Sequence, residues 1–404
     1  MLSRLDSDLE FWTNIENIVL SFSVVTDSIS EDVTADNFSD VAALASETLH
    51  PVIFDSDGSI TESLYGQSSQ YYLLGFAGFT TPAADDGVIE SGLALFNCLC
   101  VGSNTTCPSD IDVSELDATI VHEMGHFIGL DHTAVNEDLV NSPCDTAVLG
   151  DCSTVPIMYP TTFDAFEPLA VQEDDKIATL ALYGNDGWDA SYCTVTGSLV
   201  DTDGNPLLCA DVQAVSSDTA DTVSFVSGYL ALATDENNDG DAVDDGECTS
   251  DCGDFILRLQ PATDYSITIK PLTETWISSS SVGPCKNEQL TGIIEEEIST
   301  VSGCTAGETI ELGVVATQST GGISSGDTTG ESDGTTSTAD CGEGQDFTHC
   351  DELVSCALNP MKVGNVRGVT RVISLMIFGA IVTVNYVKIR SRKQKTKNKT
   401  KSTD

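Results

Sequence analysis

The sequence predicts an α+β domain, an all-β sandwich and a C-terminal transmembrane helix, in that order along the chain. Residues 113–128 repeat apolar side chains at three- and four-residue steps, which is the period of a half-buried helix. Short apolar runs separated by Gly, Pro and Asp occur between 193 and 316, a pattern typical of strands joined by turns. An uncharged apolar run covers 372–387. We therefore divide the chain into a first domain (1–188), a sandwich domain (189–317), a flexible linker rich in Gly, Ser, Thr and acidic residues (318–340), a cysteine-containing juxtamembrane segment (341–371), a transmembrane or sorting segment (372–389) and a basic tail (390–404).

The first domain begins with elements whose sequence signals are short. Residues 18–25 and 71–79 are predicted strands and residues 36–49 a predicted helix, from their apolar patterns. Between them, a strand starting at residue 51 runs into a turn that contains Asp55 and Asp57. An Asx-stabilised turn explains the two carboxylates, and a structural calcium is the alternative, because hard cations bind closely spaced oxygens.

The strongest helix signal lies at 113–128. Asp112, followed three residues later by Glu115, predicts a capping box at its start. Gly129 is free to adopt a positive φ, so we expect the helix to end there and the chain to double back. The apolar positions that recur with the helical period are Val113, Leu116, Ile120, Val121, Met124, Phe127 and Ile128.

Three histidines in and just after this helix have the spacing of metal ligands. His122 and His126 are one turn apart and project from one face, and the turn after the helix brings His132 round as a third ligand. Three neutral imidazoles leave a fourth position for water, which is the arrangement of a catalytic zinc site, and Glu123 is placed as its general base. Taken alone, each of these histidines could instead be a surface residue or a hydrogen-bonded residue of the core. The chain has five histidines, however, and three of them fall in this run.

The run from His122 to His132 resembles the long zinc signature of the metzincin peptidases, whose third ligand follows a glycine turn, here at Gly129. The resemblance covers roughly residues 10 to 186 and is strongest in this run. It implies an α+β zincin fold with a twisted mixed sheet and a zinc helix, one catalytic Zn²⁺ and a protein or peptide substrate.

Two further elements resemble the matrixin branch of that family. Metzincins carry a methionine in a tight turn beneath the zinc, and Met158 in the run Val-Pro-Ile-Met-Tyr-Pro matches it, with Pro160 directly after the tyrosine. The predicted helix at 174–184 is similar to the closing helix of matrixin catalytic domains, and Gly184 is suited to end it. Met158 is accordingly expected to support the metal site.

The resemblance implies an exported zinc-dependent endopeptidase in which Glu123 activates a zinc-bound water. A surface-displayed binding or adhesion protein with an inactive zincin domain is the alternative, and the intact Glu123 argues against it. A nonproteolytic zinc hydrolase is a third reading, which the methionine turn and the closing helix disfavour.

The second domain resembles carboxypeptidase-regulatory-like domains, small β-sandwiches that are often appended to secreted enzymes. Within it, a run of alternating oxygen-bearing residues matches the first seven positions of a calcium loop, with Gly240 at the sharp turn. The acidic residue wanted at position twelve is replaced by Gly246, so an acidic, disulfide-pinned loop is the alternative. The candidate Ca²⁺ ligands are Asp235, Asn237, Asp239 and Asp241.

Composition indicates an extracytoplasmic location. Fourteen cysteines are scattered along the chain, which favours disulfides and an oxidising compartment. The net charge of −48 disfavours nucleic acid and anionic lipid as partners of the domains.

The C-terminal region indicates attachment to a membrane. The uncharged run 372–387 would span about 24 Å as a helix, and eight of the 16 Lys and Arg residues follow it between Lys388 and Lys401. The positive-inside rule then places the basic tail in the cytoplasm and the domains outside, and a cleaved bacterial sorting signal is the alternative to a permanent anchor. Residues 1–17 carry acidic side chains and no apolar core, so we expect the export signal to lie upstream of the given start.

Overall fold

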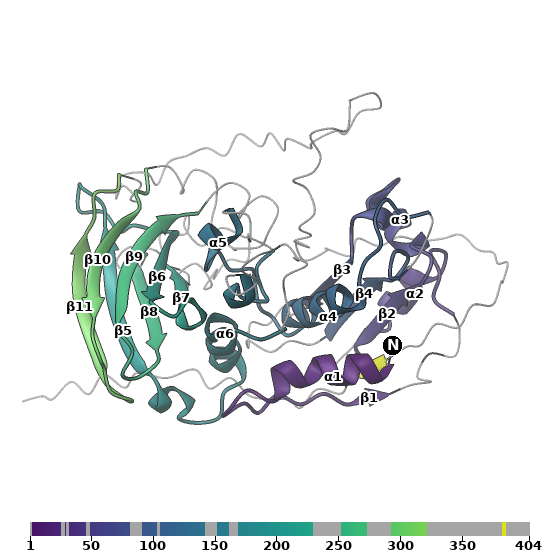
Figure 1. Cartoon of the computed structure of the whole chain (residues 1–404), viewed down its shortest axis with the longest axis horizontal. Coiled ribbons are helices and arrows are strands. Elements are labelled where there is room, and N and C mark those ends of the chain that lie inside the picture. Colours follow the sequence, from purple (N-terminus) through teal and green to yellow (C-terminus); the bar gives the residue numbers. More distant parts are fainter. Residues whose placement is uncertain are drawn as a thin grey trace, which may run out of the picture.

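The structure is a computed structural model in which two lobes lie side by side (Figure 1). The N-terminal lobe contains the elements from α1 to α6 together with β12, and the sandwich lobe contains those from β5 to β11. Helices α5 and α6 lie between the sandwich and helix α4 (Figure 1). The structure describes residues 2–25, 29, 32–45, 49–80, 91–102, 106–141, 152–160, 169–228, 252–272, 292–320 and 382–384.

The N-terminal lobe is built on a mixed sheet of five strands in the order β1-β12-β2-β4-β3. Strand β2 runs parallel to β4, whereas β3 pairs antiparallel to β4 and forms one edge of the sheet. Almost every residue of β4 is buried, as expected for a strand covered on both faces. The strands are β1 (Val24–Val25), β2 (Pro51–Asp55), β3 (Gly75–Thr80), β4 (Ser91–Asn97) and β12 (Val382–Val384).

Helix α4 is the long central helix of this lobe, and α1 packs along it. Leu5, Leu9 and Trp12 of α1 are buried, and the Trp12 indole Nε1 donates to the Val121 carbonyl at 2.9 Å. This contact joins segments that are 109 residues apart in the sequence. The helices are α1 (Leu2–Thr13), α2 (Phe38–Ala42), α3 (Ser59–Tyr65), α4 (Val113–Phe127), α5 (Glu137–Asn141) and α6 (Glu173–Tyr183), with short 3-10 turns η1 (Ser69–Tyr71), η2 (Cys152–Thr154), η3 (Trp188–Ser191) and η4 (Thr219–Asp221).

Two of the early elements are shorter than their apolar patterns predict. Within the described residues, the expected helix at 36–49 is represented by α2, where Phe38 and Val41 are buried, whereas Leu44 in its expected continuation is exposed. The expected strand at 18–25 is reduced to β1, and Ile18 forms only an isolated bridge with Gly184. Leu20 is nevertheless buried in the core, so the segment before β1 lacks strand pairing and not burial.

The start of α4 differs from the predicted capping box. Asp112 is the N-cap residue with extended backbone, and its carbonyl accepts the first helical hydrogen bond from Leu116 at 3.1 Å. Its side chain makes no capping hydrogen bond, so the predicted box is absent. The predicted start of the helix is confirmed, and the predicted capping box is wrong.

The sandwich lobe consists of one sheet in the order β10-β9-β6-β7 and another in the order β11-β5-β8. Alternate residues of facing strands, such as Val195, Val212, Leu257 and Ile267, bury their side chains in one common core. This is the alternation that two stacked sheets require. The strands are β5 (Cys193–Val200), β6 (Ala210–Ser216), β7 (Val223–Val226), β8 (Asp254–Leu259), β9 (Tyr265–Pro271), β10 (Glu296–Val301) and β11 (Thr309–Ala316).

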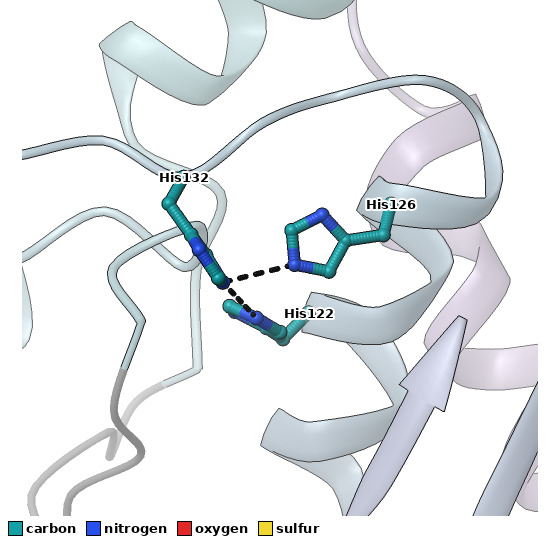
Figure 2. A group of neighbouring side chains, drawn as sticks. All are labelled: His122, His126 and His132. Atoms are coloured by element: carbon teal, nitrogen blue, oxygen red, sulfur yellow. Dashed lines mark hydrogen bonds between the residues drawn. The ribbon is translucent and has the colours of Figure 1, made fainter. Parts of the chain in front are cut away.

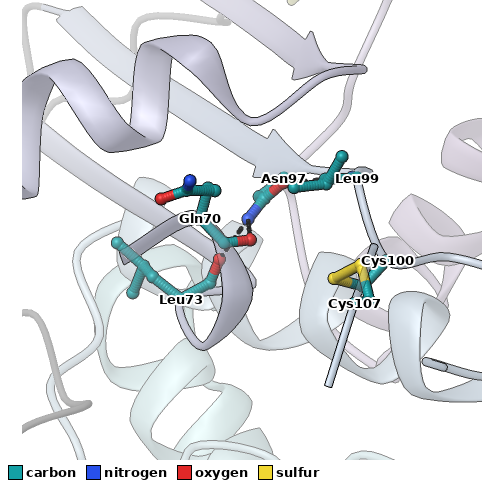
Figure 3. The surroundings of a disulfide bond; sticks show 6 residues. All are labelled: Gln70, Leu73, Asn97, Leu99, Cys100 and Cys107. Atoms are coloured by element: carbon teal, nitrogen blue, oxygen red, sulfur yellow. Dashed lines mark hydrogen bonds between the residues drawn. A yellow bond between two sulfur atoms is a disulfide. The ribbon is translucent and has the colours of Figure 1, made fainter. Parts of the chain in front are cut away.

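Disulfides are present in both lobes. Cys193 and Cys304 join the two ends of the sandwich across 111 residues, and Cys100 bonds to Cys107 just after β4. Figure 3 shows the second bond beside Asn97, whose Nδ2 donates to the carbonyls of Gln70 and Leu73 at 2.8 and 2.7 Å. The end of β4 is therefore fixed by a covalent bond and by hydrogen bonds before the chain enters α4.

Several predicted segments lie outside the described residues. They include the candidate calcium loop at 235–241 and most of the chain beyond residue 320, of which only β12 is described. Within the described part of the chain, no helix is both long enough and apolar enough to cross a membrane.

Candidate metal centre

Helix α4 carries two of the three predicted ligands on one face. His122 and His126 are separated by one turn, and both are buried. Their ring centroids lie 4.8 Å apart. Figure 2 shows the two imidazoles projecting from the helix toward His132.

The turn after α4 brings in the third histidine. Gly129 has a φ of +97°, the left-handed conformation that favours glycine, and the Leu130 N–H donates to the Gly125 carbonyl at 3.0 Å. The chain then doubles back, as predicted, and places His132 Nε2 3.0 Å from His126 Nε2 and 3.2 Å from His122 Nε2 (Figure 2). Three ring nitrogens from two segments thus converge on one point.

The outer nitrogens of the two helical histidines face backbone carbonyls. His122 Nδ1 lies 2.6 Å from the Ile157 oxygen, and His126 Nδ1 lies 2.8 Å from the Leu130 oxygen. Because a carbonyl can only accept, each Nδ1 carries the proton, and the lone pair of each neutral ring is on the inward-facing Nε2. Metal-binding histidines are commonly oriented by this kind of outer hydrogen bond.

Burial keeps the three rings neutral. Loss of solvation lowers the pKa of His122 to about 3 and that of His126 to about 4, and it lowers the pKa of His132 as well. Neutral imidazole is the form that binds metals.

The donor set fits a tetrahedral metal ion. Nitrogens bound at about 2.0–2.1 Å to such an ion are separated by roughly 3.3 Å, close to the two spacings of 3.0 and 3.2 Å in this cluster. Within the described ranges, these histidines are the one group of three or more His, Cys, Asp or Glu side chains that could hold a metal ion. A set of three imidazoles suits zinc among the divalent metals, and other transition metals also accept it.

Glu123 lies next to the first ligand and against the edge strand. It is buried, and burial raises the pKa of its carboxyl to about 8, while a hydrogen bond from the Ala77 backbone acts in the opposite direction. A Cβ atom added at Gly75 would stand 3.1 Å from the Glu123 Cγ. The small residues of β3 therefore allow the Glu123 side chain to pack against the strand.

Met158 lies against the turn of α4 between His122 and His126. It is buried in a tight turn in which the Tyr159 N–H donates to the Pro156 carbonyl at 3.1 Å. The Met158 carbonyl in turn accepts from the Thr133 N–H, also at 3.1 Å, and Thr133 follows the third histidine directly. The predicted methionine turn thus contacts both segments that carry the histidines.

Asp175 holds this turn and was not singled out as a functional residue by sequence. Its buried carboxylate accepts from the backbone N–H groups of Ile157, Met158 and Gln172 at 3.0, 3.1 and 2.9 Å. Burial raises the pKa of Asp175 to about 7, and these hydrogen bonds oppose the shift. Asp174 and Asp175 stand at the start of the predicted closing helix, which was the available sequence signal. The sequence did not indicate which backbone groups Asp175 would bind.

Asp57 forms the predicted Asx-stabilised turn, and Asp55 bonds to the start of α3 instead. Asp57 Oδ1 accepts from the Ser59 N–H at 3.0 Å, and Asp55 Oδ2 accepts from the N–H and hydroxyl of Thr61 at 2.8 and 2.9 Å. The candidate calcium ligands Asp235, Asn237, Asp239 and Asp241 lie outside the described residues.

No family model matches the chain, and no curated protein matches it. Among solved structures, a 9R-lipoxygenase from Cyanothece PCC8801 is similar with a TM-score of 0.17 and 10% identity. The similarity covers 32% of this chain and 17% of the lipoxygenase, and it carries no argument about fold or function.

Proposed function

We propose that the chain is a zinc-dependent endopeptidase of the matrixin-like metzincin type. The observation that carries the proposal is the convergence of His122, His126 and His132 through their Nε2 atoms, with Glu123 adjacent. The methionine turn beneath the helix and the antiparallel edge strand beside it support the same family.

The chemistry divides between the ion and the protein. A zinc ion held by three imidazoles lowers the pKa of water to about 7 and polarises a carbonyl. The charge of the bound ion would favour the ionised form of the Glu123 carboxyl, against the effect of burial, and this carboxylate would accept the proton of the attacking water and return it to the departing amine. Its burial against β3 keeps it away from bulk water and close to the ligand His122.

Strand β3 supports a peptide substrate over a small molecule. It is the last strand in its sheet, so within the described residues its outer edge has no strand partner. Ala77 in the middle of β3 hydrogen-bonds to Glu123, which brings the edge next to the reacting groups. An extended peptide that pairs with this edge would bind through its backbone, as in β-augmentation.

The disulfides support the proposed extracytoplasmic location. Cys193–Cys304 and Cys100–Cys107 are formed in the structure, and Cys209 and Cys252 are disulfide-bonded as well. Such bonds persist in oxidising compartments and are rare in the cytosol.

The test is zinc-dependent cleavage of a denatured protein by the full chain. We expect Glu123→Ala to retain zinc and to lower the cleavage rate by about 10²–10⁴-fold, because general base catalysis is lost. Glu62→Ala, which removes an exposed carboxylate on α3, is the matched control and should leave the rate unchanged. A folded, zinc-loaded wild-type chain that does not cleave would favour the surface-displayed binding protein instead.

A further inference from the structure

The sandwich lobe contacts the segments that support the three histidines. Asn136, which follows the third histidine by four residues, donates from its Nδ2 to the Thr154 carbonyl at 2.8 Å. The same Nδ2 donates to the Thr219 carbonyl of the sandwich lobe at 2.9 Å. One side-chain amide therefore joins the loop after His132, the approach to the methionine turn and the second lobe.

Asn136 is well suited to this bridging position. Its φ is +63°, a left-handed conformation that Asn adopts more readily than most residues. The Nδ2 group has two hydrogens, and two carbonyls receive them. Asn136 therefore suits this position both by its backbone conformation and by its two side-chain donors.

Thr154 lies close in sequence to the carbonyl group that orients His122. Thr154 stands three residues before Ile157, whose carbonyl faces His122 Nδ1 at 2.6 Å. A second hydrogen bond between the lobes joins the Thr154 and Thr219 hydroxyls at 2.7 Å. Thr219 opens η4, the turn between β6 and β7, so the contact comes from the body of the sandwich.

A third contact reaches the other side of the same turn. The buried Asp174 carboxylate accepts from the Ser224 N–H of β7 at 2.7 Å. Its neighbour Asp175 holds the Ile157 and Met158 N–H groups. The sandwich is thus hydrogen-bonded both before and after the segment that orients His122.

We propose that Asn136 and Thr219 are positioning residues through which the β-sandwich forms part of the support of the metal centre. Asn136 holds the loop that carries His132 against the segment that orients His122, and Thr219 fixes that junction from the second lobe. The proposal rests on the metal-binding part of the proposed function and is independent of peptide cleavage. It gives the sandwich lobe a role in supporting the three histidines.

The test compares Asn136→Gly and Asn136→Asp in the full chain. Glycine keeps the positive φ and loses the amide, while aspartate keeps the shape and replaces the donor by an acceptor. We expect both to bind Zn²⁺ and Co²⁺ about tenfold more weakly, and to alter the visible absorption of bound Co²⁺, because the ligand geometry relaxes. Asn185→Asp, at an exposed position, is the control for the added charge.

Thr219→Val tests the hydroxyl contact from the second lobe and leaves the Thr219 carbonyl, which accepts from Asn136, in place. It removes one hydroxyl and alters no residue of the N-terminal lobe, and we expect a several-fold loss of metal affinity with the fold intact. Wild-type affinity and Co²⁺ spectrum in Asn136→Gly and Thr219→Val would overturn the proposal, since only the backbone conformation would then matter. A wild-type chain that binds zinc without cleaving peptides would overturn the proposed function and leave this inference standing.

Discussion

Gly125 lies directly against the Met158 side chain, and a Cβ atom at position 125 would stand 2.2 Å from the Met158 Sδ. The same Cβ would stand 3.0 Å from Cζ2 of Trp12. Gly125 lies between the two helical histidines in sequence, so this close approach sets how near the methionine turn comes to the turn of α4 that carries them. A glycine inside a helix normally lowers its stability, and the tight contact explains its presence here.

Gly125→Ala should destabilise the chain despite the higher helix propensity of alanine. The added methyl group overpacks the contact with Met158, at a cost of about 1–3 kcal/mol in the free energy of unfolding. Urea unfolding measures this change. Ser114→Ala, at an exposed position of the same helix, is the control and should be neutral or slightly stabilising. Adding Met158→Ala to Gly125→Ala should restore part of the lost unfolding free energy. If it does not, the contact with Met158 does not cause the loss.

Asp175→Asn should loosen the methionine turn. The carboxylate accepts three backbone hydrogen bonds through two oxygens, whereas an amide must turn its NH₂ group toward at least one of these donors. We expect a loss of about 2–3 kcal/mol in unfolding free energy, together with weaker zinc binding in a calorimetric titration. Asp186→Asn, at an exposed site, provides the control. Unchanged stability and unchanged zinc affinity would show that the turn does not depend on Asp175.

Asp8 should make stability depend on pH. Burial against α4, reinforced by the neighbouring Asp117, raises the pKa of Asp8 to about 7, and Arg4 acts in the opposite direction. The folded chain therefore binds a proton at Asp8 that the unfolded chain has released. This contribution to stability is complete below the unfolded pKa of about 4 and is lost as pH rises toward 7.

Asp8→Asn should accordingly make the chain more stable at pH 8 by about 1–2 kcal/mol and leave its stability at pH 4 nearly unchanged. Thermal unfolding across this range measures the difference. Asp6→Asn, at an exposed position of the same helix, should keep the wild-type profile. An equal gain at both pH values would point to a packing effect and not to the lost proton.

The convergence of the three histidines was predictable because its determinants are local. Two histidines one turn apart, a glycine able to take positive φ and a third histidine lie within eleven residues, and the structure brings the three rings together. Strand β9 of the second lobe was predictable for the same reason, since buried residues alternate with less buried ones along it, and β5 shows the same alternation over its first half. The activity remains a proposal.

The supporting contacts were not predictable, because they join segments that are distant in sequence. Helix α1 depends on packing of Trp12 against Val121, and Asp175 acts on Ile157 and Met158 in a turn that lies before it in the chain. The bridge through Asn136 likewise depends on a partner 83 residues away. A periodicity within one segment contains no information on such partners.

The most direct test of the proposed peptidase is to map new peptide termini by mass spectrometry after the zinc-loaded full chain acts on a proteome-derived peptide mixture. We predict cleavage at internal peptide bonds, abolished by chelation, restored by zinc, and absent from Glu123→Ala loaded with the same amount of zinc. A wild-type chain that is folded, holds one zinc ion and leaves the mixture uncut would contradict the account.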